Sequence, residues 1–180
     1  MRLSGTSSIS CDGSRGRGRF NNVQITWRGV CEVVIALACD HGGFELMRDV
    51  KDFLDAGGYE YKDFGTNSAE SCDYPEIAVV AARAVSGGEC DRGIFICGTG
   101  AGMAIAANKV PGIRAASCSD CFTAEMIRRH NDANVLTLGA RVTGVGLALK
   151  IVELFLSTGF DGGRHGVRVG MLNALDDKRA

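Results

Sequence analysis

The sequence lacks the features that mark several large classes of protein. Its 20 basic and 21 acidic residues leave a formal net charge of −1, without the broad positive field of a dedicated nucleic-acid-binding protein. No apolar run is long enough to cross a bilayer, so no membrane partner is expected. Cysteine accounts for only eight of 180 residues, fewer than in a small disulfide-stabilised scaffold. We therefore expect a globular, cytoplasmic protein with reduced thiols.

Histidine is also scarce, with three residues in the chain. His41, His130 and His165 lie in the polar contexts DHGG, RHND and GGRHG, which favour a functional over a buried structural role. Neither these histidines nor the pair Cys118 and Cys121 have the spacing of a four-ligand zinc cluster, so no metal site is expected. The C-x-x-C pair lies outside a thioredoxin-like βαβ start, which leaves thiol redox exchange as a weaker alternative.

Composition changes near residue 31. Residues 1–30 hold five arginines against one acid, with many serines and glycines, and they show no helical or strand periodicity and no apolar secretion segment. We predict that residues 1–30 are a disordered or non-core N-terminal extension. Residues 31–180 are then the single folded domain, whose apolar and charged content suits a packed core.

From residue 33 onward, short β-branched apolar runs alternate with segments of helical spacing. This alternation predicts an α/β fold of three layers, a Rossmann- or flavodoxin-like five-stranded parallel sheet with helices on both faces and a C-terminal helix. A strand order of 2-1-3-4-5 suits five strands in one domain. The expected strands cover residues 33–38, 59–64, 93–97, 113–118 and 134–138. The expected helices cover residues 43–56, 74–86, 101–109, 122–129, 145–158 and 167–178.

Chemically capable residues follow the first and third strands. In such folds, ligands bind beyond the carboxyl ends of the strands, where the strand order reverses. The first strand ends in Asp40 and His41, and the third ends in Cys97 and the glycine loop GTGAG of residues 98–102. The N–H groups of such a loop form an anion site at a helix start. A thiol there can become a thiolate base or nucleophile, although a buried structural thiol, as expected for Cys39, Cys90 and Cys118, is an open alternative.

Arginines near the C-terminus suggest an anionic ligand. Arg164 and Arg168 are four residues apart, so one helical turn places both guanidinium groups on one face, in a geometry suited to phosphate. A solvated surface helix is the alternative. Arg141 directly follows the fifth strand and is expected at the crevice.

Eight short motifs follow one another between residues 33 and 175: CDHGG, DYP, CGTGAG, AANK, GIRA, RHND, LGAR and GGRH. In this order and spacing they resemble the type-B ribose-5-phosphate isomerases, a family that includes the galactose-6-phosphate isomerase subunits. The resemblance implies reversible conversion of ribose 5-phosphate to ribulose 5-phosphate in the pentose phosphate pathway, without metal or organic cofactor.

The resemblance also implies a role for each matching residue. Cys97 moves a proton between C2 and C1 of the sugar through an enediolate, and Met103 stands where another subgroup has a glutamate base. His130 opens the furanose ring as a general acid, Thr99 acts on the sugar oxygens, and the loop backbone holds the enediolate charge. The residues expected to contact substrate hydroxyls or phosphate are Asp40, His41, Tyr74, Gly98, Gly100, Ala101, Gly102, Asn131, Arg141, Arg164 and Arg168.

The predicted topology separates these residues. His130 and Asn131 precede the fifth strand, so they lie at the end of the sheet away from Cys97, roughly 17 Å across a five-residue strand. We expect them, together with Arg164 and Arg168, to enter the site from a second subunit of a two-fold homodimer or tetramer. An interfacial active site is also what the resemblance implies.

Besides thiol redox exchange, two other functions remain open. One is isomerisation of a six-carbon substrate such as galactose or allose 6-phosphate, although the thiol, the ring-opening histidine and the arginines on one chain favour a self-sufficient homo-oligomer. The other is a non-catalytic module that binds phosphorylated metabolites through the glycine loop and the arginine pair.

Overall fold

The computed structural model describes residues 17–20, 23–26 and 33–176, and the chain divides into two units, residues 1–32 and 33–180. In the first unit, β1 (Arg17–Phe20) and β2 (Val23–Thr26) form an antiparallel pair. The expectation of no strand in residues 1–30 is therefore wrong at these two segments, because VQIT carries the alternation of β-branched and polar residues that favours a strand. The rest of the predicted extension lies outside the described residues.

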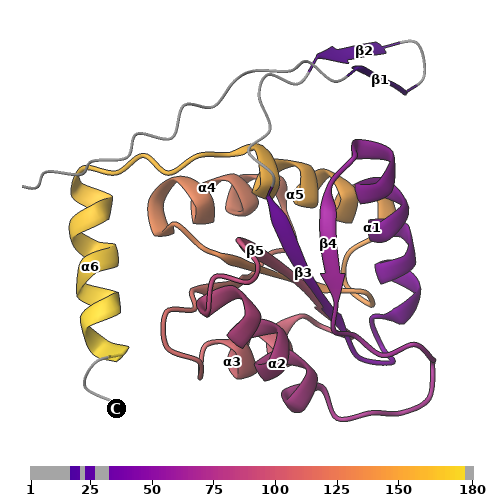
Figure 1. Ribbon diagram of the computed structural model, residues 1–180, viewed down its shortest axis with the longest axis horizontal. Coiled ribbons are helices and arrows are strands. Elements are labelled where there is room, and N and C mark those ends of the chain that lie inside the picture. Colours follow the sequence, from indigo (N-terminus) through magenta and orange to yellow (C-terminus); the bar gives the residue numbers. More distant parts are fainter. Residues whose placement is uncertain (1–16, 21–22, 27–32, 177–180) are drawn as a thin grey trace, which may run out of the picture. The chain divides into compact units, whose positions relative to one another are not determined.

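The centre of the second unit is a parallel sheet (Figure 1). Its strands are β3 (Val34–Cys39), β4 (Glu60–Asp63), β5 (Arg92–Cys97), β6 (Ala115–Ser117) and β7 (Val135–Gly139). Their order is β4-β3-β5-β7-β6, with every neighbouring pair parallel. The α/β class is confirmed, but the expected order is wrong in its last two strands. All of β7 is buried, which suits an interior strand, whereas the short, partly exposed β6 forms the edge.

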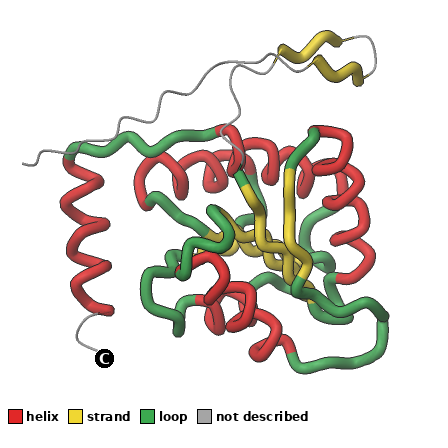
Figure 2. The backbone as a smooth tube through the Cα atoms, in the orientation of Figure 1, coloured by secondary structure: helices red, strands yellow, loops and turns green. Residues whose placement is uncertain are grey.

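Helices cover both faces of this sheet, as predicted (Figure 2). They are α1 (Phe44–Gly57), α2 (Tyr74–Ser86), α3 (Ala101–Ala107), α4 (Cys121–Asn131), α5 (Val145–Ser157) and α6 (Arg164–Asp176). One apolar core lies between the sheet and α1, α4 and α5, and a second lies between the sheet and α2 and α3. None of the helices among the described residues is both long and apolar enough to span a bilayer.

Several helix ends have identifiable causes. The Asp120 carboxylate accepts the Thr123 N–H at 2.7 Å and caps α4. Helix α3 ends at Ala107, two residues before the predicted position, and the side chain of the next residue, Asn108, pairs with both backbone groups of Ala115. Helix α6 begins at Arg164, three residues earlier than predicted, so Arg164 and Arg168 do lie one turn apart.

Three thiols are structural, as expected. Cys39, Cys90 and Cys118 are at most 3% exposed in the two cores. Burial, as the largest cause, raises the pKa of Cys39 and of Cys118 from 9.0 to about 12. Both groups therefore remain neutral thiols at physiological pH.

These raised pKa values predict a loss of stability in alkali. An unfolded chain releases the Cys118 proton near pH 9, whereas the folded chain holds it until about pH 12, so the free energy of unfolding falls as the pH rises through this window. The contribution is about 1.4 kcal/mol for one thiol at about pH 10. Urea unfolding, measured at about pH 8 and about pH 10, should therefore show a smaller fall in the free energy of unfolding for Cys118→Ala than for the unmodified protein. Cys121→Ala removes a half-buried thiol and is the control, which should behave as the unmodified protein does. A fall in the free energy of unfolding that is as large in Cys118→Ala as in the unmodified protein contradicts the prediction.

Candidate active site

The carboxyl ends of three neighbouring strands meet at one edge of the sheet. Cys39 of β3 pairs with Ile96 of β5, and Cys97 of β5 pairs with Gly139 of β7. The residues that follow these strands therefore face one another at the point where the strand order reverses. This edge is where the sequence places the ligand site, with β7 rather than β6 beside β5.

Cys97 lies at the centre of this edge, 5% exposed. The Gly100 N–H donates a hydrogen bond to its Sγ at 3.2 Å, so the glycine loop folds back over the sulfur. Gly100 adopts φ +80°, and a side chain there would come within 3.0 Å of the Leu138 carbonyl carbon, so glycine is required for this turn. Backbone donors of this kind stabilise an oxyanion that lies beside them.

The turn after β3 packs directly against the same loop. The Asp40 carboxylate is 6% exposed and accepts the Gly43 N–H at 3.0 Å. A methyl group on Gly43 would lie 2.6 Å from the Ile96 carbonyl carbon, and one on Gly42 would lie 3.2 Å from the Gly98 nitrogen. The backbones after β3 and β5 therefore touch, which brings Asp40 to the glycine loop.

Tyr74 borders the loop from α2, and His41 is tied to the segment that precedes α2. The ring of Tyr74 covers Gly102, where an added methyl group would meet the ring at 2.8 Å. The Nδ1 of His41 accepts the Cys72 N–H at 3.3 Å, which ties the segment before α2 to the turn after β3. An accepting Nδ1 leaves the Nε2 of His41 as the donor.

On the opposite side, Arg141 follows β7. Its backbone N–H donates to the Gly98 carbonyl at 3.0 Å, and its exposed guanidinium lies beside Gly98, 3.5 Å from a methyl group placed there. Thr99 is exposed on the same loop. The structure thus brings Asp40, Tyr74 and Arg141 to the glycine loop that covers Cys97. His41 is held beside them through Cys72.

The remaining predicted residues form a separate cluster. His130 and Asn131 end α4, just before β7 begins, and Arg164 and Arg168 lie on α6. They lie toward the amino end of β7, whereas Cys97 lies at the carboxyl end. This separation within one chain agrees with the topological argument from the sequence.

His165 belongs to this cluster, although sequence reasoning assigned it no role. Its ring stacks on that of His130, with centroids 4.2 Å apart and an angle of 2° between the planes. The only signal for His165 in the sequence is the GGRH motif. The stacking itself could not be predicted, because it pairs residues 35 positions apart in the chain.

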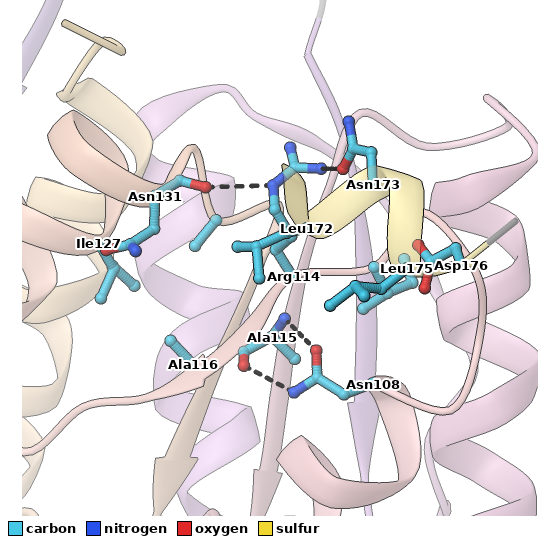
Figure 3. A pocket seen from close by; sticks show the side chains of 12 residues that line it. Asn108, Arg114, Ala115, Ala116, Ile127, Asn131, Leu172, Asn173, Leu175 and Asp176 are labelled. Carbon is cyan, nitrogen blue, oxygen red and sulfur yellow. Dashed lines mark hydrogen bonds between the residues drawn. The ribbon is translucent and has the colours of Figure 1, made fainter. Parts of the chain in front are cut away.

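A cavity of about 400 Å³ lies elsewhere, between β6, the end of α4 and α6 (Figure 3). Its polar groups are largely paired with one another. Arg114 donates to the Asn131 carbonyl at 3.1 Å and to the Asn173 side chain at 3.3 Å. Of the predicted site residues only Asn131 lines this cavity, so the cavity is separate from the residues around Cys97. Residues 33–176 also contain no group of three or more side chains arranged to hold a metal ion.

Comparison with known proteins identifies the family. The family model for Ribose/Galactose Isomerase matches residues 35–172. The chain belongs to this family. Ribose-5-phosphate isomerase B of Escherichia coli is 49% identical over 145 residues, which cover 81% of this chain and 97% of that protein. The expected resemblance to type-B isomerases is confirmed.

Solved structures agree with this assignment. Ribose-5-phosphate isomerase B of Clostridium thermocellum is 54% identical with a TM-score of 0.81, and the match covers 82% of this chain and 100% of that one. The enzyme of Thermotoga maritima is 48% identical with a TM-score of 0.77, and the match covers 79% and 98% of the two chains. The resemblance therefore extends over most of residues 33–176.

The backbone contact at Gly43 yields a stability prediction. Gly43→Ala forces the turn after β3 away from β5, because the added methyl group meets backbone rather than a movable side chain. We expect the free energy of unfolding to fall by about 1–3 kcal/mol. The control is Gly159→Ala, where an added methyl group meets nothing within 4 Å and the change should stay within about 0.5 kcal/mol. Equal urea midpoints for the two variants contradict this account of the site.

Proposed function

We propose that this protein is an aldose–ketose isomerase that interconverts ribose 5-phosphate and ribulose 5-phosphate. The observation that carries the proposal is the Cys97 sulfur beneath the Gly100 N–H, at 3.2 Å. A C–H bond next to a carbonyl is a weak acid, so its cleavage needs a base and donors that hold the resulting oxyanion. In this proposal Cys97 is the base, and the backbone N–H groups of the glycine loop are the donors.

The reaction then proceeds through three proton transfers. The Cys97 thiolate takes the proton from C2 of the open-chain aldose, and the electron pair of that bond forms the C1–C2 double bond of an enediolate with the charge on O1. The loop N–H groups stabilise that charge. The Cys97 thiol next returns the proton to C1, while the proton of the C2 hydroxyl passes to O1, with Thr99 as the relay, and C2 becomes the carbonyl.

The other residues orient the sugar phosphate. Asp40, His41 and Tyr74 border the loop and contact hydroxyl groups, and Arg141 contacts the phosphate. Among the described residues no carboxylate forms a salt bridge with Arg164 or Arg168. Two such guanidinium groups one turn apart suit a phosphate dianion.

The proposed enzyme is a two-fold oligomer with shared sites. Ring opening needs a general acid near the sugar, and His130 fills this role only if it approaches Cys97 of a second copy, since its own Cys97 lies beyond the length of β7. Asn131, Arg164 and Arg168 enter with it. Each pair of subunits then forms two equivalent sites.

Removal of the thiol tests the chemistry. Cys97→Ala should lower turnover of ribose 5-phosphate by about 10²–10⁴-fold, while the dissociation constant for ribose 5-phosphate, measured by calorimetry, changes only modestly. Cys121→Ala is the control and should retain full turnover. A fully active Cys97→Ala contradicts the thiol base, and an unmodified protein that turns over galactose 6-phosphate or allose 6-phosphate faster than ribose 5-phosphate contradicts the proposed substrate.

Mixed oligomers test the shared site. Cys97→Ala and His130→Ala should each be inactive alone. When the two variants are dissociated and reassembled together, half of the dimers are mixed and one of the two sites in each has both native residues, so about one quarter of native activity should return. No recovery in verified mixed dimers, or a fully active monomer after dilution, contradicts the shared site.

A further inference from the structure

Two of the three histidines in the chain form one stacked pair. His130 lies in the last turn of α4 and His165 in the first turn of α6. Their ring centroids are 4.2 Å apart and their planes are parallel within 2°. His165 is only 9% exposed, so this contact restricts the orientations open to the His130 ring.

An ion pair and a backbone hydrogen bond join the end of α4 to the segment that leads into α6. Arg129, the residue before His130, forms an ion pair with Asp161 at 3.1 Å. The Asp161 N–H in turn donates to the Arg129 carbonyl at 3.0 Å. These bonds fix the segment that leads into α6 against the end of α4, and so fix His165 against His130.

The charges around His165 favour its neutral form. The Nε of Arg164 donates to its Nε2 at 3.4 Å, which requires an Nε2 without a proton. Burial, followed by the positive charges of His130, Arg164 and Arg168, lowers the pKa of His165, and Asp161 opposes this only in part. His165 therefore presents a neutral aromatic face to its partner, whereas two imidazolium rings in this position would repel each other.

We propose that His165 is a positioning residue for ring opening, which holds the imidazole of His130 by stacking so that His130 can deliver a proton to the ring oxygen of the sugar. This inference rests on the proposed function, in which His130 is the general acid. His165 does not touch the reacting atoms. It acts through the orientation of the ring it covers, and its aromatic face rather than its nitrogen atoms carries this role.

The chemistry of the two sugars allows ring opening to be measured separately. Ribose 5-phosphate closes a five-membered ring through O4 and C1, so it must be opened before C2 loses its proton. Ribulose 5-phosphate has its carbonyl at C2, and the oxygen needed for a five-membered ring carries the phosphate, so this sugar is already open. Deuterium uptake at C1 of ribulose 5-phosphate in D₂O therefore reports proton transfer at Cys97 without ring opening.

The test compares both reactions in His165→Ala, His165→Phe and the unmodified protein. We expect His165→Ala to lower turnover of ribose 5-phosphate about 10–100-fold, since misplacement of a catalytic group costs that much. Its deuterium uptake into ribulose 5-phosphate should stay within about twofold. His165→Phe keeps a flat aromatic ring and should restore most of the lost turnover.

The control is Val169→Ala, which removes a buried side chain of α6, 8% exposed, one turn beyond His165. It should leave both reactions unchanged. Turnover by His165→Ala equal to that of the unmodified protein overturns the inference, as does a parallel fall in both reactions or a loss in His165→Phe as large as in His165→Ala. An unmodified protein without activity on either sugar instead overturns the proposed function.

Discussion

Direct contact between backbones at the carboxyl edge of the sheet is the constraint on which this site depends. The turn after β3 passes so close to β5 that a methyl group on Gly43 would overlap the Ile96 carbonyl group. The turn after β5 is equally tight, and Gly100 there needs its left-handed conformation to aim an N–H at Cys97. The turn that holds Asp40 therefore touches the loop that covers Cys97.

A parallel sheet also divides the chemistry between its two ends. Residues after strands, such as Asp40, Cys97 and Arg141, collect at the carboxyl edge, whereas residues before strands, such as His130, collect at the amino edge. No rearrangement of loops within one chain moves a residue from one edge to the other. If His130 and Cys97 serve one reaction, a second copy must supply one of them, so in this proposal the oligomer follows from the topology.

Much of the fold could be predicted from local pattern, but the parts that depend on long-range packing could not. Helical spacing and β-branched runs located the strands and helices of the second unit within a few residues. The predicted order of β6 and β7 was wrong because both are short apolar segments in the sequence. Only the complete burial of β7 in the structure shows which of the two is the interior strand. Adjacent glycine motifs predicted the surroundings of Cys97, whereas the stacking of His130 on His165 joins two helices that no local pattern connects.

In the proposed enzyme, the position of the arginines links substrate anchoring to ring opening. Arg129 is already paired with Glu125 and Asp161, so Arg164 and Arg168 are the cations of this cluster that remain for a phosphate among the described residues. Both lie in the first turns of α6, on either side of His165 in the sequence. In the proposed enzyme, a phosphate bound there places the far end of the sugar against the same helix that orients His130. A sugar without phosphate lacks this anchor and therefore also lacks a defined position relative to the general acid.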